Sequence, residues 1–354
     1  MEKLRGLFIL DEEAYEMAYG PDERHAIARF VDLVAPRQTV ESIAQRMDLL
    51  SNVQVIFSGW NAPVLDERFL AAAPQLRVVF YAAGSTGNFV TTAAWNRGVI
   101  VTSAYAANAI PVAEYTLSMI LFSLKHGWRM MRELRNFPHA PDRNTAVGCY
   151  GSSVGLISLG VIARTLADLL RSFDLNVLAY DPFVAPETAR MLGVTLVSLD
   201  ELFERGDVVS LHTPLLSETI GMIGAPHFNR MKPGATFINT ARGAVVREKE
   251  MYESLKARPD LQAVLDVTEA EPIDPRSPLF ELPNVVLTPH IAGSVGDECR
   301  RMGRYMVEEL ERLIRNEPLR WAVTPELAQF TCHRPVTVST GPAAKQPRRV
   351  IAAT

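Results

Sequence analysis

Four consecutive strand-like segments in the second half of the sequence are each followed closely by residues that could do chemistry. The segments and their followers are Val208–Leu211 with His212 and Thr213, Ala235–Asn239 with Thr240, Ala241 and Arg242, Ala263–Leu265 with Asp266, and Val285–Thr288 with His290. In an open parallel sheet, ligands bind outside the carboxyl ends of the strands, so we expect these residues to converge on one crevice. Each alone could simply satisfy local backbone groups, but Arg, Asp and His at successive strand ends indicate a site.

An arginine, a histidine and a carboxylate around one crevice suit hydride transfer beside a nicotinamide. A histidine titrates in the range needed to give a proton to, or take one from, a substrate hydroxyl. An arginine holds an α-carboxylate with a bidentate fork that lysine cannot reproduce. A carboxylate bonded to the imidazole would fix its tautomer and raise its pKa. Asp266, Glu269 and Glu271 could each supply that carboxylate, and the spacing does not choose among them.

A glycine-containing turn between two further strand-like segments could hold a dinucleotide. Val154–Ile157 leads into a turn that places Ser158, Gly160 and Ala163 where a G-x-G-x-x-G motif has its glycines. Serine must make a tight turn that glycine makes at lower cost, so a plain structural turn is the alternative. Asp181 follows the next strand, where an acidic residue binds the adenosine ribose, and it would repel a 2′-phosphate. The unit therefore indicates NAD in preference to NADP.

The elements that must position these residues alternate between strands and helices along the whole chain. In the first part we expect strands over Gly6–Leu10, Val53–Phe57, Val78–Tyr81 and Val99–Val101, with amphipathic segments over Asp22–Ala35 and Ser42–Leu50. Apolar strands that alternate with helices are typical of parallel sheets buried on both faces. The pattern predicts two α/β units, joined by a helix over Ile110–His126 with a proline near its first turn.

Composition excludes several classes of protein. With 354 residues and a net charge of −4, the chain is long enough for two domains and lacks the basic field that nucleic-acid binding needs. The three cysteines are far apart, which argues against a disulfide framework or a metal site. The apolar run Tyr115–Leu124 is about half of a membrane span, and the N-terminus lacks a signal-peptide layout. We expect a cytoplasmic protein whose residues 331–354, with four basic and no acidic side chains, form a disordered tail.

Three motifs resemble the signatures of the D-isomer-specific 2-hydroxyacid dehydrogenase family, in its phosphoglycerate dehydrogenase-like form. They are Asn239-Thr240-Ala241-Arg242-Gly243, Asp266-Val267-x-x-x-Glu271-Pro272 and Thr288-Pro289-His290-Ile291-Ala292-Gly293. The resemblance extends from about residue 50 to 325 and includes Asn108-Ala109-x-x-Val112-Ala113-Glu114. Motifs of this length in this order are far more specific than the degenerate glycine turn.

The resemblance implies a role for each matching residue. His290 would be the acid/base, Glu271 its partner, and Arg242 the group that holds the substrate carboxylate and carbonyl. The implied cofactor-binding residues are Gly160, Val161, Ile162, Asp181, His212, Thr213, Thr240, Ala241, Asp266 (facing the nicotinamide carboxamide) and Gly293. In the small domain, the backbone of Gly84 and Ser85 would bind the substrate carboxylate, although this loop departs from the family's usual sequence.

The resemblance also implies an arrangement of domains. A Rossmann NAD-binding domain over 106–298 would be inserted into a smaller, flavodoxin-like substrate domain formed by 1–105 and 299–330. The site would lie in a cleft that closes on a 2-ketoacid or 2-hydroxyacid. The family implies a homodimer through the cofactor domain, so the helix over Ile110–His126 is either partly an interface or intrachain packing.

Two function classes fit these residues. One is an NAD-dependent D-2-hydroxyacid dehydrogenase. The other is an NAD(H)-sensing binding protein, like the C-terminal binding protein corepressors, which resemble the same family and can retain the Arg, Glu and His. The basic tail weakly favours the second class, and turnover on a ketoacid discriminates between them. Trp60, after the expected strand Val53–Phe57, could cap a substrate pocket but is expected to be core packing.

Overall fold

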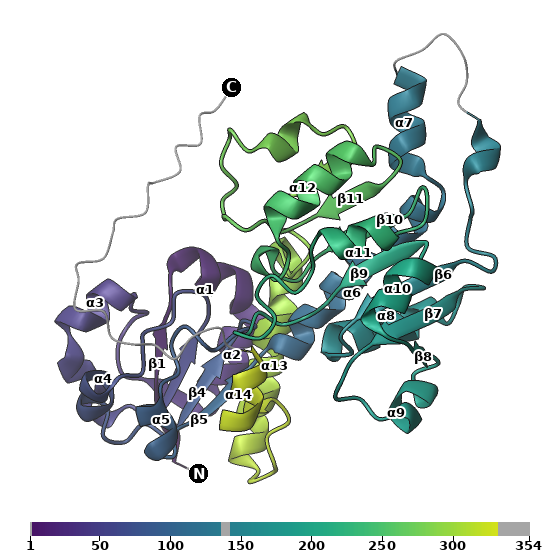
Figure 1. The fold of residues 1–354 in the computed structure, drawn as a ribbon. Helices are drawn as coiled ribbons and strands as arrows, with labels where there is room; N and C mark the ends of the chain where they lie inside the picture. Colours follow the sequence, from purple (N-terminus) through teal and green to yellow (C-terminus); the bar gives the residue numbers. More distant parts are fainter. Residues whose placement is uncertain (1, 136–141, 332–354) are drawn as a thin grey trace.

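The computed structural model describes residues 2–135 and 142–331, with side chains described up to residue 328, and it contains two separate sheets (Figure 1). The predicted tail lies outside the described residues from 332 onward. The first sheet has the strand order β13-β5-β4-β3-β1-β2. Its strands are β1 (Leu4–Ile9), β2 (Val31–Leu33), β3 (Val55–Ser58), β4 (Val78–Tyr81), β5 (Ile100–Ser103) and β13 (Ala322–Val323). All neighbours are parallel except β13, which pairs antiparallel with β5, and the order 2-1-3-4-5 is the flavodoxin-like one.

The second sheet is entirely parallel and has the order β12-β11-β10-β9-β6-β7-β8. Its strands are β6 (Ser153–Ile157), β7 (Asn176–Tyr180), β8 (Thr195–Leu196), β9 (Val208–Leu211), β10 (Thr236–Asn239), β11 (Gln262–Leu265) and β12 (Val285–Leu287). This order reverses direction between β6 and β9, as in a Rossmann fold. The expected pair of doubly wound sheets is confirmed, and in sequence the second sheet lies between β5 and β13 of the first.

Successive strand residues of the first sheet enter two different cores, which explains their continuous apolar runs. Phe8 and Phe57 pack on one face of the sheet, while Leu7 and Ile56 pack on the other. The first core includes α13 (Cys299–Ile314), although this helix follows the whole second sheet in sequence. The aromatic stack between Phe57 and Phe80, with ring centroids 5.1 Å apart, lies in this core. The small domain is therefore completed by the far end of the chain.

The helices cover the sheets and carry the connections between them. Those of the small domain are α1 (Glu12–Ala18), α2 (Pro21–Ala28), α3 (Val40–Gln45), α4 (Glu67–Ala72), α5 (Thr92–Asn96), α13 and α14 (Pro325–Thr331). The connecting helix α6 (Tyr105–Leu124) leads to α7 (Gly127–Arg135). The helices of the second sheet are α8 (Val161–Leu170), α9 (Pro186–Met191), α10 (Leu199–Arg205), α11 (Ala225–Arg230) and α12 (Glu248–Ala257). The exact domain boundaries at 105, 298 and 330 stay predictions.

Three expected elements differ from the structure. The segment Ser42–Leu50 is not one helix, because α3 ends at Gln45 and a 3₁₀ helix over Met47–Asn52 follows it. The segment Asp22–Ala35 is not one helix, because α2 ends at Ala28 and β2 follows it. The connecting helix begins at Tyr105, five residues before the expected start, so Pro111 lies inside it. Its 20 residues are long and apolar enough to cross a membrane, contrary to the expectation from Tyr115–Leu124, but half of the most apolar window is buried inside the protein. We interpret α6 as a core helix that packs against α8 and α13.

Candidate active site

A histidine–carboxylate pair lies at the carboxyl edge of the second sheet. His290 follows β12, and its Nδ1 lies 3.0 Å from Oε2 of Glu271. The carboxylate only accepts hydrogen bonds, so Nδ1–H donates and the opposite ring nitrogen, Nε2, faces away from Glu271. The structure thus selects Glu271 from the three carboxylates that the spacing left open. Both side chains are partly exposed, as a pair that must meet a substrate requires.

The pair shifts the pKa values of both members. The pKa of His290 is raised, chiefly by the hydrogen bond to Glu271, although burial and the charge of Arg242 oppose the rise. Burial would raise the pKa of Glu271, but the hydrogen bond from His290 and the charges of His290 and Arg242 outweigh it, and the net shift is downward. The arrangement therefore favours a protonated imidazole beside an ionised carboxylate, which is the state that can donate a proton to a ketone oxygen.

Asp266 holds the loop that carries His290. Its side chain is only 2% exposed, and its two carboxylate oxygens accept the N–H groups of Ile291 and Ala292, each at 2.8 Å. Its backbone carbonyl accepts the N–H of His290 at 2.9 Å. His290 itself has a φ of 56°, a left-handed conformation that is strained for a residue with a side chain. These bonds hold the strained residue in place, and the predicted contact of Asp266 with nicotinamide stays a prediction.

Arg242 follows β10, and β10 pairs with β11, the strand that Asp266 follows. Its Nη1 donates to the carbonyl of Ala241 at 2.7 Å, and within the described chain its guanidinium forms no ion pair. The side chain is exposed. Because β10, β11 and β12 are adjacent parallel strands, Arg242, Asp266 and His290 follow the same edge of the sheet. The charge of Arg242 is felt by both His290 and Glu271, so an anion beside the pair would meet a cation.

The predicted dinucleotide turn has the geometry of a phosphate-binding site. Gly160 is the residue before α8, and within the described chain no side chain caps this helix and no atom lies within 4 Å of where a Cβ on Gly160 would be. The N–H groups of the first turn, which includes Val161 and Ile162, are thus open to an anion. Asp181 is oriented by the N–H groups of Leu159 and Phe183, each at 2.8 Å. These features fit an NAD pyrophosphate and ribose.

Ser158 makes the turn that a glycine was expected to make. Its φ is 72°, in the left-handed region, and its hydroxyl lies 2.9 Å from that of Thr213 at the end of β9. His212 precedes Thr213 in the sequence, and burial lowers the pKa of its imidazole to about 4, so the ring is neutral. His212 Nε2 bonds Ser210 Oγ at 3.0 Å, and its buried Nδ1 finds no partner among the described residues. An unsatisfied ring nitrogen beside the turn agrees with a ligand there.

The remaining predicted cofactor residues are buried or lie against α6. Thr240 Oγ1 lies 3.2 Å from Thr116 Oγ1 of that helix, and Ala241 is buried beside it. A Cβ on Gly293 would come within 3.1 Å of Asn108 Oδ1, so Gly293 contacts the start of α6. In the part of the chain that the structure describes, no group of three or more His, Cys, Asp or Glu side chains is placed to hold a metal ion.

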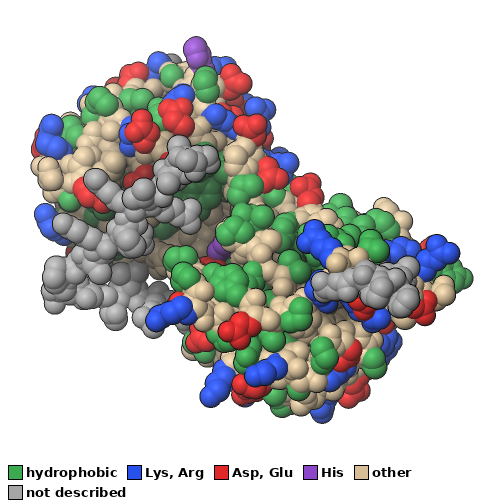
Figure 2. All heavy atoms as spheres, turned by 90° about the horizontal axis from the view of Figure 1, so that it is seen from above, with side chains coloured by type: hydrophobic (Ala, Val, Ile, Leu, Met, Phe, Trp, Pro, Cys, Tyr) green, Lys and Arg blue, Asp and Glu red, His purple; other side chains and the backbone are tan. Residues whose placement is uncertain are grey.

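The predicted substrate loop, Gly84 and Ser85, follows β4 of the small domain. A Cβ added to Gly84 would lie 3.9 Å from Asn108 Nδ2. Asn108 therefore contacts both this loop and Gly293. Trp60, after β3, is 37% exposed, and its expected role in the core is therefore wrong. Figure 2 shows a hollow between two lobes of the molecule, and a histidine side chain is visible in it. The structure thus brings the small-domain loop toward the His290 loop through α6.

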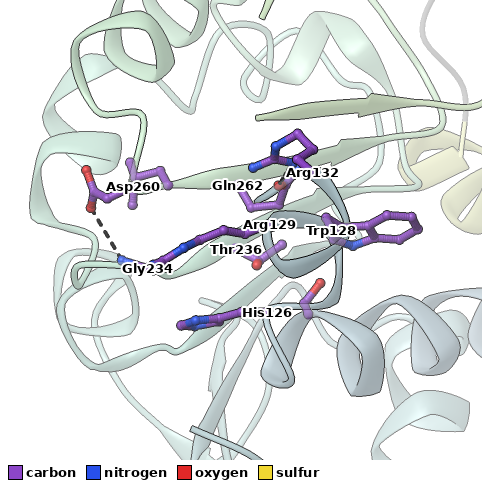
Figure 3. A pocket seen from close by; sticks show the side chains of 10 residues that line it. His126, Trp128, Arg129, Arg132, Gly234, Thr236, Asp260 and Gln262 are labelled. Carbon is purple, nitrogen blue, oxygen red and sulfur yellow. Dashed lines mark hydrogen bonds between the residues drawn. The ribbon is translucent and has the colours of Figure 1, made fainter. Parts of the chain in front are cut away.

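A separate pocket of about 270 Å³, including its open mouth, lies at the opposite edge of the second sheet (Figure 3). Thr236 and Gln262, which begin β10 and β11, line it together with His126 and Arg132. Arg132 Nη1 donates to Gln262 Oε1 at 2.9 Å. Because these residues are at the amino ends of the strands whose carboxyl ends carry Arg242 and Asp266, this pocket is separate from the candidate active site.

Sequence reasoning missed three residues that hold the site together. Asn108 Oδ1 accepts the N–H of Ser294 at 2.8 Å, and Tyr115 Oη lies 2.8 Å from Thr288 Oγ1. Asn108 was visible inside a family-like motif but had no assigned role. Nothing in the sequence pairs Tyr115 with Thr288, because the two are separated by 173 positions.

Comparisons with known proteins identify the family of this chain. The family model described as "D-isomer specific 2-hydroxyacid dehydrogenase, NAD binding domain" matches residues 117–292. The chain is 34% identical to a glyoxylate reductase of Korarchaeum cryptofilum over 72% of this chain and 77% of that protein. It is 35% identical to a D-3-phosphoglycerate dehydrogenase of Archaeoglobus fulgidus, of which the match spans 49% and thus about half the length.

Solved structures give the same result for the fold. A Thermus thermophilus protein superposes with a TM-score of 0.70 at 26% identity, covering 91% of this chain and 100% of that one. A phosphoglycerate oxidoreductase of Rhizobium etli superposes with a TM-score of 0.76 over 91% and 97% of the two chains, and at 21% identity it supports the fold alone. The chain belongs to the D-isomer-specific 2-hydroxyacid dehydrogenase family and carries that family's NAD-binding domain.

Proposed function

We propose that this protein reduces a small 2-ketoacid to the D-2-hydroxyacid with NADH, and catalyses the reverse oxidation with NAD. The observation that carries the proposal is the 3.0 Å bond between His290 and Glu271, at the same strand edge as the exposed Arg242. Relatives named glyoxylate reductase and D-3-phosphoglycerate dehydrogenase support the reaction class. They leave the substrate's side chain open, because they act on different acids.

The chain's own residues account for binding and proton transfer. Arg242 would hold the α-carboxylate and polarise the keto oxygen through its fork of N–H donors. His290, protonated at Nε2, would give its proton to that oxygen. Glu271 would stabilise the imidazolium and fix its orientation, and the lowered pKa of its carboxyl group favours the ionised form. Reduced NAD, when bound, supplies the hydride to the keto carbon, so one hydride and one proton convert the ketone to the alcohol.

Cofactor binding would use the uncapped start of α8 and the strand ends around it. The N–H groups of Val161 and Ile162 would contact the pyrophosphate, with Gly160 leaving room for it. The Asp181 carboxylate would accept hydrogen bonds from the adenosine ribose and disfavour a 2′-phosphate. The predicted set of Thr213, Thr240, Ala241 and Gly293 would line the groove, and the backbone of Gly84 and Ser85 would hold the substrate from the other domain.

The test is NADH oxidation with a panel of 2-ketoacids, repeated with NADPH in place of NADH and with the His290→Ala variant. We expect turnover on one or a few acids, a preference for NADH, and a loss of about 10²- to 10⁴-fold in the variant, as for other general acids. NADH binding without turnover on any acid would refute the enzyme proposal and favour a cofactor-sensing protein. A variant as active as the unchanged protein would refute the role of His290.

We also propose that the protein is a homodimer in the cytoplasm. Apolar side chains on α6 and α7 are exposed in the single chain, with Phe122, Met131 and Leu134 at 37%, 45% and 63%. Helix α7 extends away from the body of the second sheet in Figure 1, and an exposed apolar surface of this kind favours a second copy as its cover. Cys149 and Cys299 are free thiols, as is usual in a reducing compartment. Light scattering that gives the mass of one chain would refute the dimer.

A further inference from the structure

Three residues form a continuous chain of hydrogen bonds from α6 to the loop that carries His290. The hydroxyl of Tyr115 lies 2.8 Å from that of Thr288, and Thr288 Oγ1 lies 2.6 Å from Asp266 Oδ1. Asp266 then accepts the N–H groups of the two residues after His290. Two side-chain bonds and the two backbone N–H groups bound by Asp266 thus link a helix, a strand end and the His290 loop.

The direction of every bond in this chain is fixed by counting protons. Asp266 Oδ1 is the acceptor of its bond with Thr288, so the Thr288 hydroxyl donates its one proton to Asp266. The same hydroxyl has no second proton, so it accepts from Tyr115. Tyr115 is therefore an obligatory donor, and replacing it with phenylalanine leaves Thr288 with an unfilled acceptor. A donor to the Thr288 oxygen strengthens the bond that this hydroxyl gives to Asp266.

The loop needs such support because of its own backbone. His290 has a φ of 56°, which costs a residue with a Cβ about 1–2 kcal/mol relative to ordinary conformations. Other backbone arrangements of the loop are therefore close in free energy unless the surroundings exclude them. Helix α6 holds the loop at both ends, through Tyr115 at Thr288 and through Asn108 at Ser294. The same helix leads directly out of the small domain after β5.

We propose that Tyr115 is a positioning residue that acts through Thr288 and Asp266 to fix the orientation of the His290 ring. The interdomain helix α6 thereby controls the orientation of the acid/base group. This inference rests on the proposed function for its effect on catalysis. The charged groups that face His290 are Glu271, Arg242 and Asp266. Of these, only Asp266 is bonded to the chain that begins at Tyr115. The orientation of the ring determines the geometry of the hydrogen bond from Nδ1 to Glu271 and the position of the proton on Nε2.

The test uses Tyr115→Phe together with Thr288→Val and its conservative counterpart, Thr288→Ser. Loss of one hydrogen bond in the chain should lower kcat by about 3- to 10-fold, while the KM for the ketoacid and the Kd for NADH change less than twofold. Thr288→Ser keeps the hydroxyl and should keep kcat. Adding Tyr115→Phe to Thr288→Val should cost nothing more, because the chain is already broken. Tyr105→Phe, on the same helix but packed against Trp321, is the matched control.

A second measurement separates this inference from the proposed reaction. The pKa of the His290 imidazole can be followed by NMR titration of the protein without ligands. A loosened loop weakens the bond to Glu271, so Tyr115→Phe should move this pKa down toward its ordinary value. If the protein turns over no ketoacid but this shift occurs, the proposed function fails and the positioning role stands. An unchanged titration, or equal kcat losses in Thr288→Ser and Thr288→Val, would overturn the role of Tyr115.

Discussion

Replacing Gly160 with alanine gives a direct test of where the cofactor binds. Gly160 has φ −70° and ψ −171°, an extended conformation that any residue adopts, and no described atom lies within 4 Å of the added Cβ. The ligand-free protein should therefore accept the methyl group. A bound pyrophosphate, in contrast, would have to lie in the space that the methyl group fills. The substitution should separate stability from affinity.

The size of each effect follows from opposing contributions. Alanine stabilises by about 0.4–1 kcal/mol through the unfolded chain, whereas it is a poorer helix cap than glycine by a similar amount. The net change in the free energy of unfolding should thus be below about 1 kcal/mol. In the complex, a displaced phosphate loses at least one hydrogen bond to a charged group, which contributes about 1.5–3 kcal/mol. The Kd for NADH should rise by about 10- to 100-fold.

Fluorescence titration with NADH measures the Kd, and thermal unfolding without ligand measures the stability. Gly84→Ala is the matched variant, because among the described atoms its added Cβ meets only Asn108 Nδ2, at the ordinary distance of 3.9 Å. It should leave the Kd for NADH unchanged and raise the KM for the ketoacid. If Gly160→Ala binds NADH as tightly as the unchanged protein, the start of α8 is not the pyrophosphate site.

Three further substitutions test the catalytic edge. Glu271→Gln removes the main cause of the raised His290 pKa. Reduction needs the protonated ring, so the rate falls as pH rises through that pKa. In the variant, the falling limb of the pH profile of kcat/KM should therefore move to lower pH. Gly243→Ala puts a Cβ 2.0 Å from the Thr268 carbonyl carbon, so thermal and urea unfolding should show a loss of about 1–3 kcal/mol, and kcat should fall with it. Arg242→Lys keeps the charge but loses the fork, so steady-state kinetics should show the ketoacid KM raised about tenfold or more, with the Kd for NADH unchanged. An unchanged pH profile would contradict the role of Glu271, and an unchanged melting curve would contradict the close packing at Gly243. An unchanged ketoacid KM would contradict the role of Arg242.

Much of the fold could be predicted because each parallel strand enters two cores and must be apolar throughout. The strand over Val78–Tyr81 was predicted to the residue. Strand β2 escaped because three residues, with only Val31 buried, carry too little pattern to interrupt a helical one. The start of α6 escaped because Pro111 is typical of a helix's first turn, yet here it lies buried inside the helix, where packing outweighs the missing N–H.

The candidate site was predictable to the extent that strand ends converge. Arg242, Asp266 and His290 required only the rule that parallel strands end at one edge. Spacing alone could not choose Glu271 among the three carboxylates, because the choice depends on the path of the loop after β11, whereas the family motif did indicate it. The Trp60 side chain was assigned to the core from its size, although a loop residue at a strand end can remain 37% exposed.

The position of the second sheet between β5 and β13 also has consequences for folding. The core beneath Phe8 and Phe57 is closed by Met302, Met306 and Leu310 of α13. During synthesis the first hundred residues leave the ribosome without the helix that covers this face. The aromatic side chains on this face stay exposed until about two hundred further residues, which include α13, have been synthesised. The cofactor domain can close its own sheet first, so we expect it to fold before the domain that precedes it in the sequence, with the N-terminal segment dependent on chaperones in the interval.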